Sequence, residues 1–256
     1  MLSMNKASIV FVVIAVGLLF YISLQKNMAI VSETNKITVT PVEHASAIIR
    51  FGDRILYTDP VGEVSRFDGL PAPNIILLTD IHSDHLDIAL LEALSGQDMR
   101  FIMPVAVASE LPENISGARV ILANGETYEI DEMIIEAVPM YNLPDTENSD
   151  FHIKGRGNGY VITYKEKRLY IAGDSAGTPE MRALENIDVA LLPMNLPYTM
   201  SVEEAADAVL NFAPKKVYPY HYRSPDGLSD VAKFKELVNA GNPDIEVVLL
   251  NWYPEI

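Results

Sequence analysis

Metal-capable side chains gather directly after a short apolar run of this sequence. The run 74–79 is typical of a buried strand, and it leads into the segment 80–85, Asp-Ile-His-Ser-Asp-His. A tight turn with this spacing brings several imidazole and carboxylate groups to one point, and both groups bind transition metals. Taken alone, the segment also fits a charged surface turn in which Asp84 or Asp87 caps the next helix.

Two later strand ends carry similar groups. Asp174 follows the predicted strand 168–172 and a glycine, and His221 follows the run 216–220, which contains the predicted strand 216–219. Functional groups of α/β proteins gather beyond strand ends, so we expect all three places to meet in the fold. Each residue also has a simpler interpretation, because an aspartate after glycine can cap a helix and a lone histidine is often a core or surface residue.

The composition limits the chemistry further. The 256 residues include five histidines and no cysteine, which excludes disulfides, thiolate nucleophiles and zinc fingers. Any transition metal must therefore be held by imidazole and carboxylate groups. The formal net charge of −16 argues against nucleic acid as a partner, because phosphates are bound by Lys and Arg.

The elements that position these residues form a mixed α/β layout, with hairpins and strands first and alternating strands and helices later. The segment 141–158 is polar and too long for a simple hairpin turn. Ser201 with Glu204 predicts a capping box at a helix start. Helices are predicted at 86–94, 104–111, 202–212 and 230–239, and strands at 37–42, 47–51, 54–58, 74–79, 101–103, 120–122, 127–130, 133–138, 160–164, 168–172, 188–192, 216–219 and 245–250.

The N-terminal segment differs in composition from the rest of the sequence. Ala7–Leu24 carries no charge and would span roughly 27 Å as a helix, about one hydrocarbon core. It predicts an N-terminal transmembrane helix, with residues 1–36 as membrane anchor and linker and 37–256 as an extracytoplasmic domain. A cleaved signal peptide is the alternative, although its cleavage site would be poor. Residues 1–36 carry a net charge of +2, so the domain carries −18.

The order Asp-x-His-x-Asp-His, then Gly-Asp, then a late His resembles the metallo-β-lactamase superfamily of metal-dependent hydrolases. It is most similar to the branch with lactonase-like and phospholipase D-like members, and the resemblance covers 37–256. It implies a four-layer αββα sandwich with two pseudo-equivalent halves and metals at one rim. The supporting segments are 43–46, 58–60, 154–160 and 192–195.

The resemblance assigns roles to five residues. His82 would bind the first metal, and Asp84 and His85 would bind the second. Asp174 would bridge the two metals, and His221 would complete the second site. Asp84 or Asp174 would also act in catalysis by orienting a water molecule and taking its proton.

Two departures from the family pattern fall on the first site. Asp80 stands where relatives place a histidine, and Asn142 stands near the expected position of a middle histidine. His152, ten residues further on, could replace that histidine. A carboxylate in place of imidazole hardens the first site toward Mn or Fe, or leaves it weak or empty. The cofactors implied are one or two divalent ions, with Zn first and Mn or Fe as alternatives.

Other residues belong beside the site in this resemblance. His44 would lie next to the metals or face the substrate, with a buried structural histidine as the alternative. Asp59 would orient a ligand or simply end a strand. Lys154 and Arg156 would bind an anionic substrate group, or belong to a solvated loop. Aromatic side chains that could line a pocket are Tyr141, Tyr198 and Tyr222.

The expected activity is metal-dependent hydrolysis, in which a metal-bound hydroxide attacks an ester, lactone, amide or phosphodiester. The substrate would be a small or lipid-like molecule, and the sequence leaves the oligomeric state open. One alternative is a degenerate protein that keeps a single structural metal. Another is a lipid-directed phosphodiesterase at the membrane.

Overall fold

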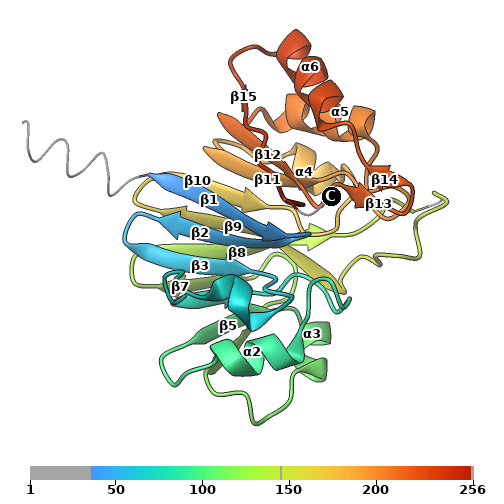
Figure 1. The fold of residues 1–256 in the computed structure, drawn as a ribbon. Coiled ribbons are helices and arrows are strands. Elements are labelled where there is room, and N and C mark those ends of the chain that lie inside the picture. The colour runs from blue at the N-terminus through green and yellow to red at the C-terminus, as the bar shows by residue number, and fades with distance from the viewer. Residues whose placement is uncertain (1–35, 145, 255–256) are drawn as a thin grey trace, which may run out of the picture. The chain divides into compact units, whose positions relative to one another are not determined.

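In the computed structural model, which describes residues 36–144 and 146–254, the chain folds into two large β-sheets with helices on their outer faces (Figure 1). The compact unit is Ile37–Ile256. The two sheets share one plan, because each begins with antiparallel strands and continues with parallel ones. The predicted α/β sandwich with two similar halves is therefore the observed architecture.

The first sheet holds six strands in chain order. The first three pair antiparallel, and the next three add parallel to them. They are β1 (Ile37–Glu43), β2 (Ser46–Phe51), β3 (Arg54–Thr58), β4 (Ile75–Leu77), β5 (Arg100–Met103) and β6 (Ala118–Ile121).

The second sheet holds seven strands in the order β15-β12-β11-β10-β9-β8-β7. Strands β7 to β10 pair antiparallel, and β10, β11, β12 and β15 run parallel. The strands are β7 (Thr127–Ile130), β8 (Met133–Met140), β9 (Gly157–Tyr164), β10 (Lys167–Ile171), β11 (Val189–Pro193), β12 (Lys216–Tyr220) and β15 (Glu246–Val247), with a separate ribbon of β13 (Arg223–Ser224) and β14 (Gly227–Leu228).

Buried strands explain the uninterrupted apolar runs of the sequence. Along β4, Ile75 and Leu77 join the core between the sheets, while Ile76 and the following Leu78 join the core under the helices of the first sheet. Because side chains alternate along a strand, only a strand covered on both faces carries such a run.

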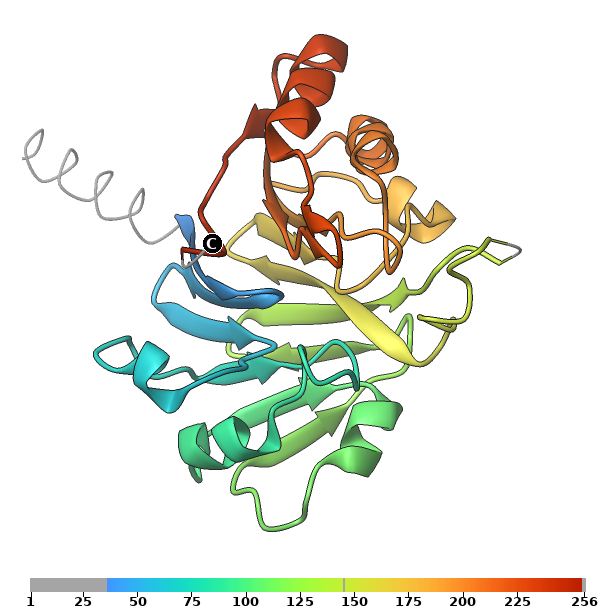
Figure 2. The same ribbon diagram turned by 45° about the vertical axis from the view of Figure 1, so that its right-hand side comes forward.

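Helices cover both outer faces (Figure 2). The capping box predicted at Ser201 is confirmed, since its Oγ accepts a hydrogen bond from the amide of Glu204 at 3.1 Å. Asp87 caps the helix after the metal-capable turn, which leaves Asp84 free of that role. The helices are α2 (Ile88–Leu94), α3 (Val105–Glu110), α4 (Pro179–Arg182), α5 (Val202–Phe212) and α6 (Val231–Gly241), with a 3₁₀ turn η1 (Val64–Phe67).

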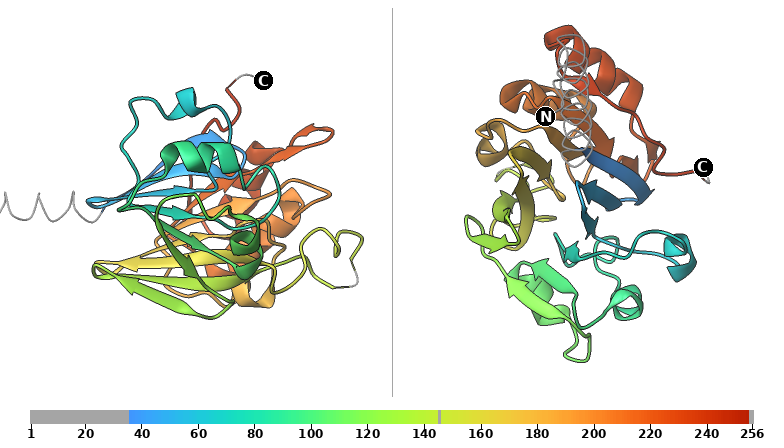
Figure 3. Two further views of the ribbon diagram at one scale, coloured as in Figure 1. Left: turned by 90° about the horizontal axis from the view of Figure 1, so that it is seen from below. Right: turned by 90° about the vertical axis from the view of Figure 1, so that its left-hand side faces the viewer.

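The loop between β8 and β9 was expected to be long, and it extends beyond the strand ends (Figure 3). The short helix α4 was not predicted from the sequence. Its signal was Thr178-Pro179, because the Thr178 side chain caps the amide of Met181 and proline fits the first helical position.

The predicted membrane anchor requires a correction. A membrane span needs about 20 consecutive apolar helical residues. The longest helices in the part of the chain that the structure describes, α5 and α6, have 11 residues each, and none there is long and apolar enough to cross a bilayer. The segment Ala7–Leu24 lies outside the described residues. On this finding the predicted membrane-anchored fold and the extracytoplasmic location drawn from it are corrected, and the fold of the described residues is the α/β sandwich.

Candidate metal centre

Loops at the ends of strands from both sheets bring the predicted site residues together. The turn after β4 supplies Asp80 to His85, and the loop between β8 and β9 supplies His152. Asp174 follows β10, and His221 follows β12. The expectation that these separate strand ends meet is therefore borne out by the geometry.

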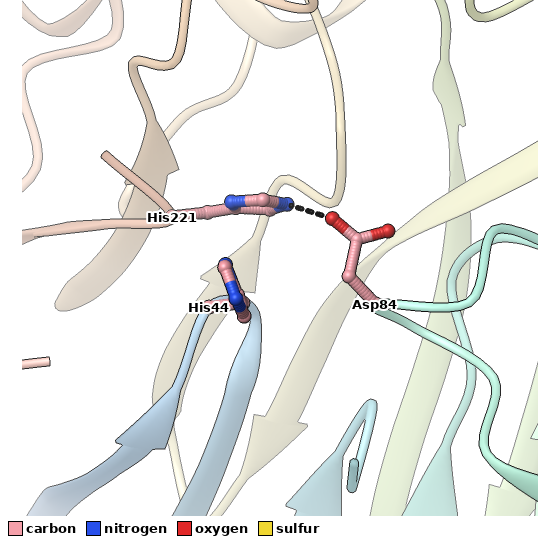
Figure 4. A group of neighbouring side chains, drawn as sticks. All are labelled: His44, Asp84 and His221. Atoms are coloured by element: carbon pink, nitrogen blue, oxygen red, sulfur yellow. Dashed lines mark ion pairs between the residues drawn. The ribbon is translucent and has the colours of Figure 1, made fainter. Parts of the chain in front are cut away.

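One group of these side chains, here called the second cluster, consists of Asp84, His85, Asp174 and His221. The Nε2 atoms of His85 and His221 each lie 3.4 Å from a different oxygen of Asp174. His221 Nε2 also lies 3.3 Å from Asp84 Oδ2, and Figure 4 shows its ring pointing at that carboxylate. Two imidazoles and two carboxylates thus face one point.

The second cluster passes a test for a bound metal. Within the described residues, His85 Nε2, His221 Nε2 and Asp174 Oδ1 are buried and have no hydrogen-bond partner. Such orphaned buried atoms cost free energy unless something else satisfies them. The ligand atoms of these three residues lie within 4.8 Å of one another, so a divalent ion fits the donor set.

Asp59 fixes the orientation of His85. Its Oδ2 accepts a hydrogen bond from His85 Nδ1 at 2.9 Å and another from the Thr79 hydroxyl, and its Oδ1 accepts the Thr79 amide at 2.7 Å. With a hydrogen on Nδ1, Nε2 is the ring atom directed at Asp174 and the one that a metal would take. Both Asp59 and His85 are fully buried, so this carboxylate–imidazole pair is built into the core.

The other side of the centre is the first cluster, which consists of Asp80, His82 and His152. His82 Nδ1 lies 2.7 Å from Asp80 Oδ2, and His152 Nε2 lies 3.6 Å from the same oxygen. His152 Nε2 also lies 3.4 Å from Asp174 Oδ2, so Asp174 faces both clusters. The three ligand atoms of the first cluster fall within 4.8 Å of one another.

The structure separates the two candidates for the missing middle histidine. His152 Nδ1 lies 3.2 Å from the carbonyl oxygen of Tyr198, which accepts its hydrogen and leaves the buried Nε2 directed at the carboxylates. Asn142 instead donates its amide hydrogens to the carbonyl oxygens of Asn148 and Tyr198 at 2.6 and 2.9 Å. Asn142 therefore stabilises the loop that positions His152.

The two cations predicted to meet an anionic substrate are engaged by carboxylates. Lys154 pairs with Glu180 of α4, and its ammonium lies 4.6 Å above the ring of Tyr141. Arg156 Nε and Nη2 lie 3.3 and 3.2 Å from the two oxygens of Asp80. Both cations are thus already paired with carboxylates, and Lys154 lines a separate pocket with Tyr141 and Asn142.

His44 lies beside the second cluster. Its ring meets that of His221 edge to face at 5.5 Å between centroids, and its carbonyl oxygen accepts the amide of His221 at 3.2 Å. Tyr253 packs on its other side, with the hydroxyl 3.4 Å from His44 Nδ1. Burial lowers the pKa of His44, and nearby His221 lowers it further. This neutral ring supports His221 from below (Figure 4).

The carboxylates of the second cluster are held ionised. Burial alone raises the pKa of Asp84 and Asp174, but the facing imidazoles of His221, His85 and His152 bring both pKa values below the ordinary range. Burial lowers the pKa of His85, yet Asp174 and Asp59 raise it well above its usual value overall. In the absence of an ion, His85 thus keeps the proton that a metal would displace.

A pocket of about 430 Å³ opens beside both clusters. Phe151 and Tyr198 form an aromatic pair on its wall, with ring centroids 5.0 Å apart. Tyr141 and Tyr222 do not line this pocket, because their hydroxyls bond to Glu180 and to the Leu250 carbonyl instead. The lining residues are His82, Ser83, Asp84, Phe151, His152, Asp174, Asn195 and Tyr198.

Several contributors were missed from the sequence. Asn195 follows β11, and its amide nitrogen lies 3.3 Å from His221 Nδ1, so the strand-end signal that marked Asp174 could also have found it. Tyr253 lies near the end of the chain and carried no such signal. The segment 173–177 matches the Gly-x-Ser-x-Gly pattern of serine hydrolases, but the Ser175 hydroxyl is fully buried and donates to the Ala176 carbonyl at 2.9 Å.

Comparisons with known proteins show what this chain is similar to. The family model described as "Beta-lactamase superfamily domain" matches residues 63–222. A UPF0173 metal-dependent hydrolase of Thermococcus onnurineus is 33% identical over 182 residues, covering 69% of this chain and 78% of that protein. One from Pyrococcus furiosus is 30% identical over 213 residues, covering 79% and 92%.

A solved structure shows the same fold. It is a protein from Parabacteroides distasonis, provisionally described as a metal-dependent hydrolase, with 35% sequence identity and a TM-score of 0.73. The match covers 83% of this chain and 92% of that one.

Proposed function

The chain belongs to the metallo-β-lactamase superfamily of metal-dependent hydrolases, and on that premise we propose that it hydrolyses a small, uncharged carboxylic ester or lactone. The observation that carries this proposal is the set of orphaned ligand atoms of the second cluster, which faces a pocket with an aromatic wall. Amides and phosphodiesters are the other substrate classes to test.

The metal would be held first by the second cluster. His85 and His221 offer Nε2 atoms, and Asp174 offers an oxygen to each side. Two imidazoles with carboxylates are a common zinc donor set, so we expect Zn²⁺, with Mn²⁺ or Fe²⁺ as alternatives. Bound there, a divalent ion supplies Lewis acidity and lowers the pKa of water toward neutrality.

Asp84 is the carboxylate best placed to handle a proton. Its side chain is 41% exposed and lines the pocket, whereas the Asp174 side chain is 5% exposed and lies among three imidazoles. His221 engages Asp84 Oδ2, which leaves Oδ1 to accept a hydrogen bond from a water molecule. Asp84 thus orients that water and takes its proton, while Asp174 holds the two clusters together.

The pocket wall favours an uncharged substrate with an apolar group. Phe151 and Tyr198 offer aromatic surface, and Phe151 is 38% exposed. The nearby cations Lys154 and Arg156 are already paired with Glu180 and Asp80. A phosphodiester would meet the carboxylate of Asp84 with no side-chain cation directed at its own charge, so the metal alone would have to offset that charge.

The test is a substrate panel of aryl esters, acyl lactones, amides and phosphodiesters with zinc-loaded protein. We expect ester or lactone turnover that a chelator abolishes, and a 10²- to 10⁴-fold lower kcat for Asp84→Asn with zinc retained. Asp226→Asn, an exposed carboxylate in the β13–β14 turn, is the matched control and should keep full activity.

Three outcomes would refute the proposal. Turnover that survives complete metal removal would exclude metal-dependent chemistry. A preference for phosphodiesters would exclude the substrate class. Zinc binding with no turnover of any substrate in the panel would favour a protein that keeps its metal for structure only.

A further inference from the structure

The two clusters present their ligand atoms in different electrostatic states. In the second cluster, Asp84 and Asp174 face imidazoles at 3.3 and 3.4 Å, and the inward atoms of His85 and His221 have no hydrogen-bond partner among the described residues. In the first cluster, the carboxylate already carries a cation. This difference decides how strongly each cluster holds a divalent ion.

The cation on the first cluster is Arg156. Its Nε and Nη2 lie 3.3 and 3.2 Å from Oδ1 and Oδ2 of Asp80, which is the forked geometry in which guanidinium binds carboxylate. Asp80 is fully buried, so solvent does little to screen this pair. The guanidinium therefore presents a positive charge to this carboxylate.

The guanidinium is fixed in this position from two further sides. Arg156 Nη2 donates to the carbonyl oxygen of Phe151 at 2.5 Å, and it lies 3.5 Å from His82 Nε2. The His82 ring therefore lies beside the Arg156–Asp80 pair, with Nδ1 2.7 Å from Asp80 Oδ2 and Nε2 near the guanidinium. An ion held by His82 Nδ1 and Asp80 Oδ2 would share that oxygen with a positive charge.

The negative charge of Asp80 and the positive charge of Arg156 balance each other. Where the family pattern predicts a histidine, Asp80 adds one negative charge to the first cluster, and Arg156 cancels it. Taken together, Asp80 and Arg156 act as a neutral pair in the place of an imidazole. A carboxylate oxygen that accepts bonds from a guanidinium donates less charge to a metal than a free one does.

From this arrangement we propose that Arg156 weakens the first cluster, so that the protein loads two ions in sequence, tightly at the second cluster and weakly at the first. The proposal rests on the metal-dependent function above, but its test counts ions and does not need activity. Arg156 is not itself among the residues that line the pocket, and it acts on the metal site through its contacts with Asp80 and His82, so it is a positioning residue.

The experiment is a titration of metal-free protein with Zn²⁺ alone, followed by competition with a chromophoric chelator and by calorimetry. Wild-type protein should load in two steps whose affinities differ by at least tenfold. Arg156→Gln should strengthen the weaker step by about 10- to 100-fold, the range that partners of metal ligands typically control. Asp80→Asn should abolish the weaker step and leave the stronger one.

Two variants separate charge from structure. Arg156→Lys keeps the positive charge and loses the fork, so it should retain the weak step near the wild-type affinity. A merely structural role would make Arg156→Lys behave as Arg156→Gln does. Lys154→Gln is the matched control, because this cation lies two residues away and pairs with Glu180, and it should leave both steps unchanged.

The number and the affinity of the Zn²⁺ binding steps support or overturn the proposal in every case. A single ion in wild type and two in Arg156→Gln would also support it, as the strongest form of the same effect. Two equally tight steps in wild type would overturn it. A weaker step that is unchanged or lost in folded Arg156→Gln would overturn it as well. Failure of every substrate in the activity panel would leave these results intact, because they are measured on the metal.

Discussion

Asp59→Asn should separate metal binding from folding, because this buried carboxylate acts on the metal centre only through His85. The replacement amide keeps the oxygen that accepts the Thr79 amide at 2.7 Å. It puts NH₂ where Oδ2 now accepts His85 Nδ1 at 2.9 Å. To avoid two donors facing each other, His85 must move its hydrogen to Nε2, and the lone pair that faces Asp174 is then lost.

The size of the effect follows from the bond that is lost. A hydrogen bond to a charged group contributes about 1.5–3 kcal/mol, and about 1.4 kcal/mol corresponds to tenfold in affinity. We therefore expect the Zn²⁺ affinity of Asp59→Asn to fall about 10- to 100-fold. Burial raises the pKa of Asp59, so a neutral amide is tolerated at this position. The melting temperature of the metal-free protein should change little.

The assay is chelator competition for Zn²⁺ together with thermal melts of metal-free protein. Asp188→Asn is the matched control, a mostly buried carboxylate that accepts hydrogen bonds from Lys167, Lys215 and the Arg168 amide far from the clusters. It should lower the melting temperature and leave Zn²⁺ affinity unchanged. A folded Asp59→Asn protein that binds Zn²⁺ within twofold of wild type would refute the reasoning.

Three further predictions follow from the same geometry. Asp174 and Asp59 raise the pKa of His85 well above its ordinary value, so a metal must displace a proton from this ring. The Zn²⁺ affinity should therefore rise with pH above about 6.5, and an affinity that calorimetry finds independent of pH would contradict this prediction. Gly173→Ala should lower stability by at least about 1 kcal/mol and weaken Zn²⁺ binding, because φ is +62° and the new Cβ would lie 2.4 Å from Met140 Sδ. Gly155→Ala is the control for backbone strain, because φ is +90° and no atom lies within 4 Å of the new Cβ. Equal losses of Zn²⁺ affinity in the two variants would refute the role of the Met140 contact. Ser201→Ala should cost about 1 kcal/mol in thermal melts, with unchanged Zn²⁺ affinity, through loss of the capping box; an unaltered melting temperature would count against that cap.

Strand ends were the most informative feature of the sequence. Asp84, His85, Asp174 and His221 were predicted to meet because each follows a strand, and a sheet brings its strand ends to a common edge. The structure places them together, while their role as metal ligands stays a prediction. Local patterns such as the Ser201 capping box were also readable, because they depend on neighbouring residues alone.

Side-chain contacts that depend on the path of a loop could not be predicted from the sequence. Whether His152 or Asn142 would face the metals depends on the path of the loop between β8 and β9, and that path is fixed by hydrogen bonds to Tyr198. Lys154 finds Glu180 on α4, a helix of four residues that was not predicted. Arg156 was expected to face substrate, but its actual partner Asp80 lies 76 residues away.

The second cluster takes His85 from the first half of the chain and Asp174 and His221 from the second. In a chain without cysteine, an ion held there would be a reversible cross-link between the two halves. A ligand that binds only the folded state shifts the folding equilibrium by mass action. The supply of free metal in the cell would then set the protein's lifetime against proteases, so abundance, as well as catalysis, would follow metal availability.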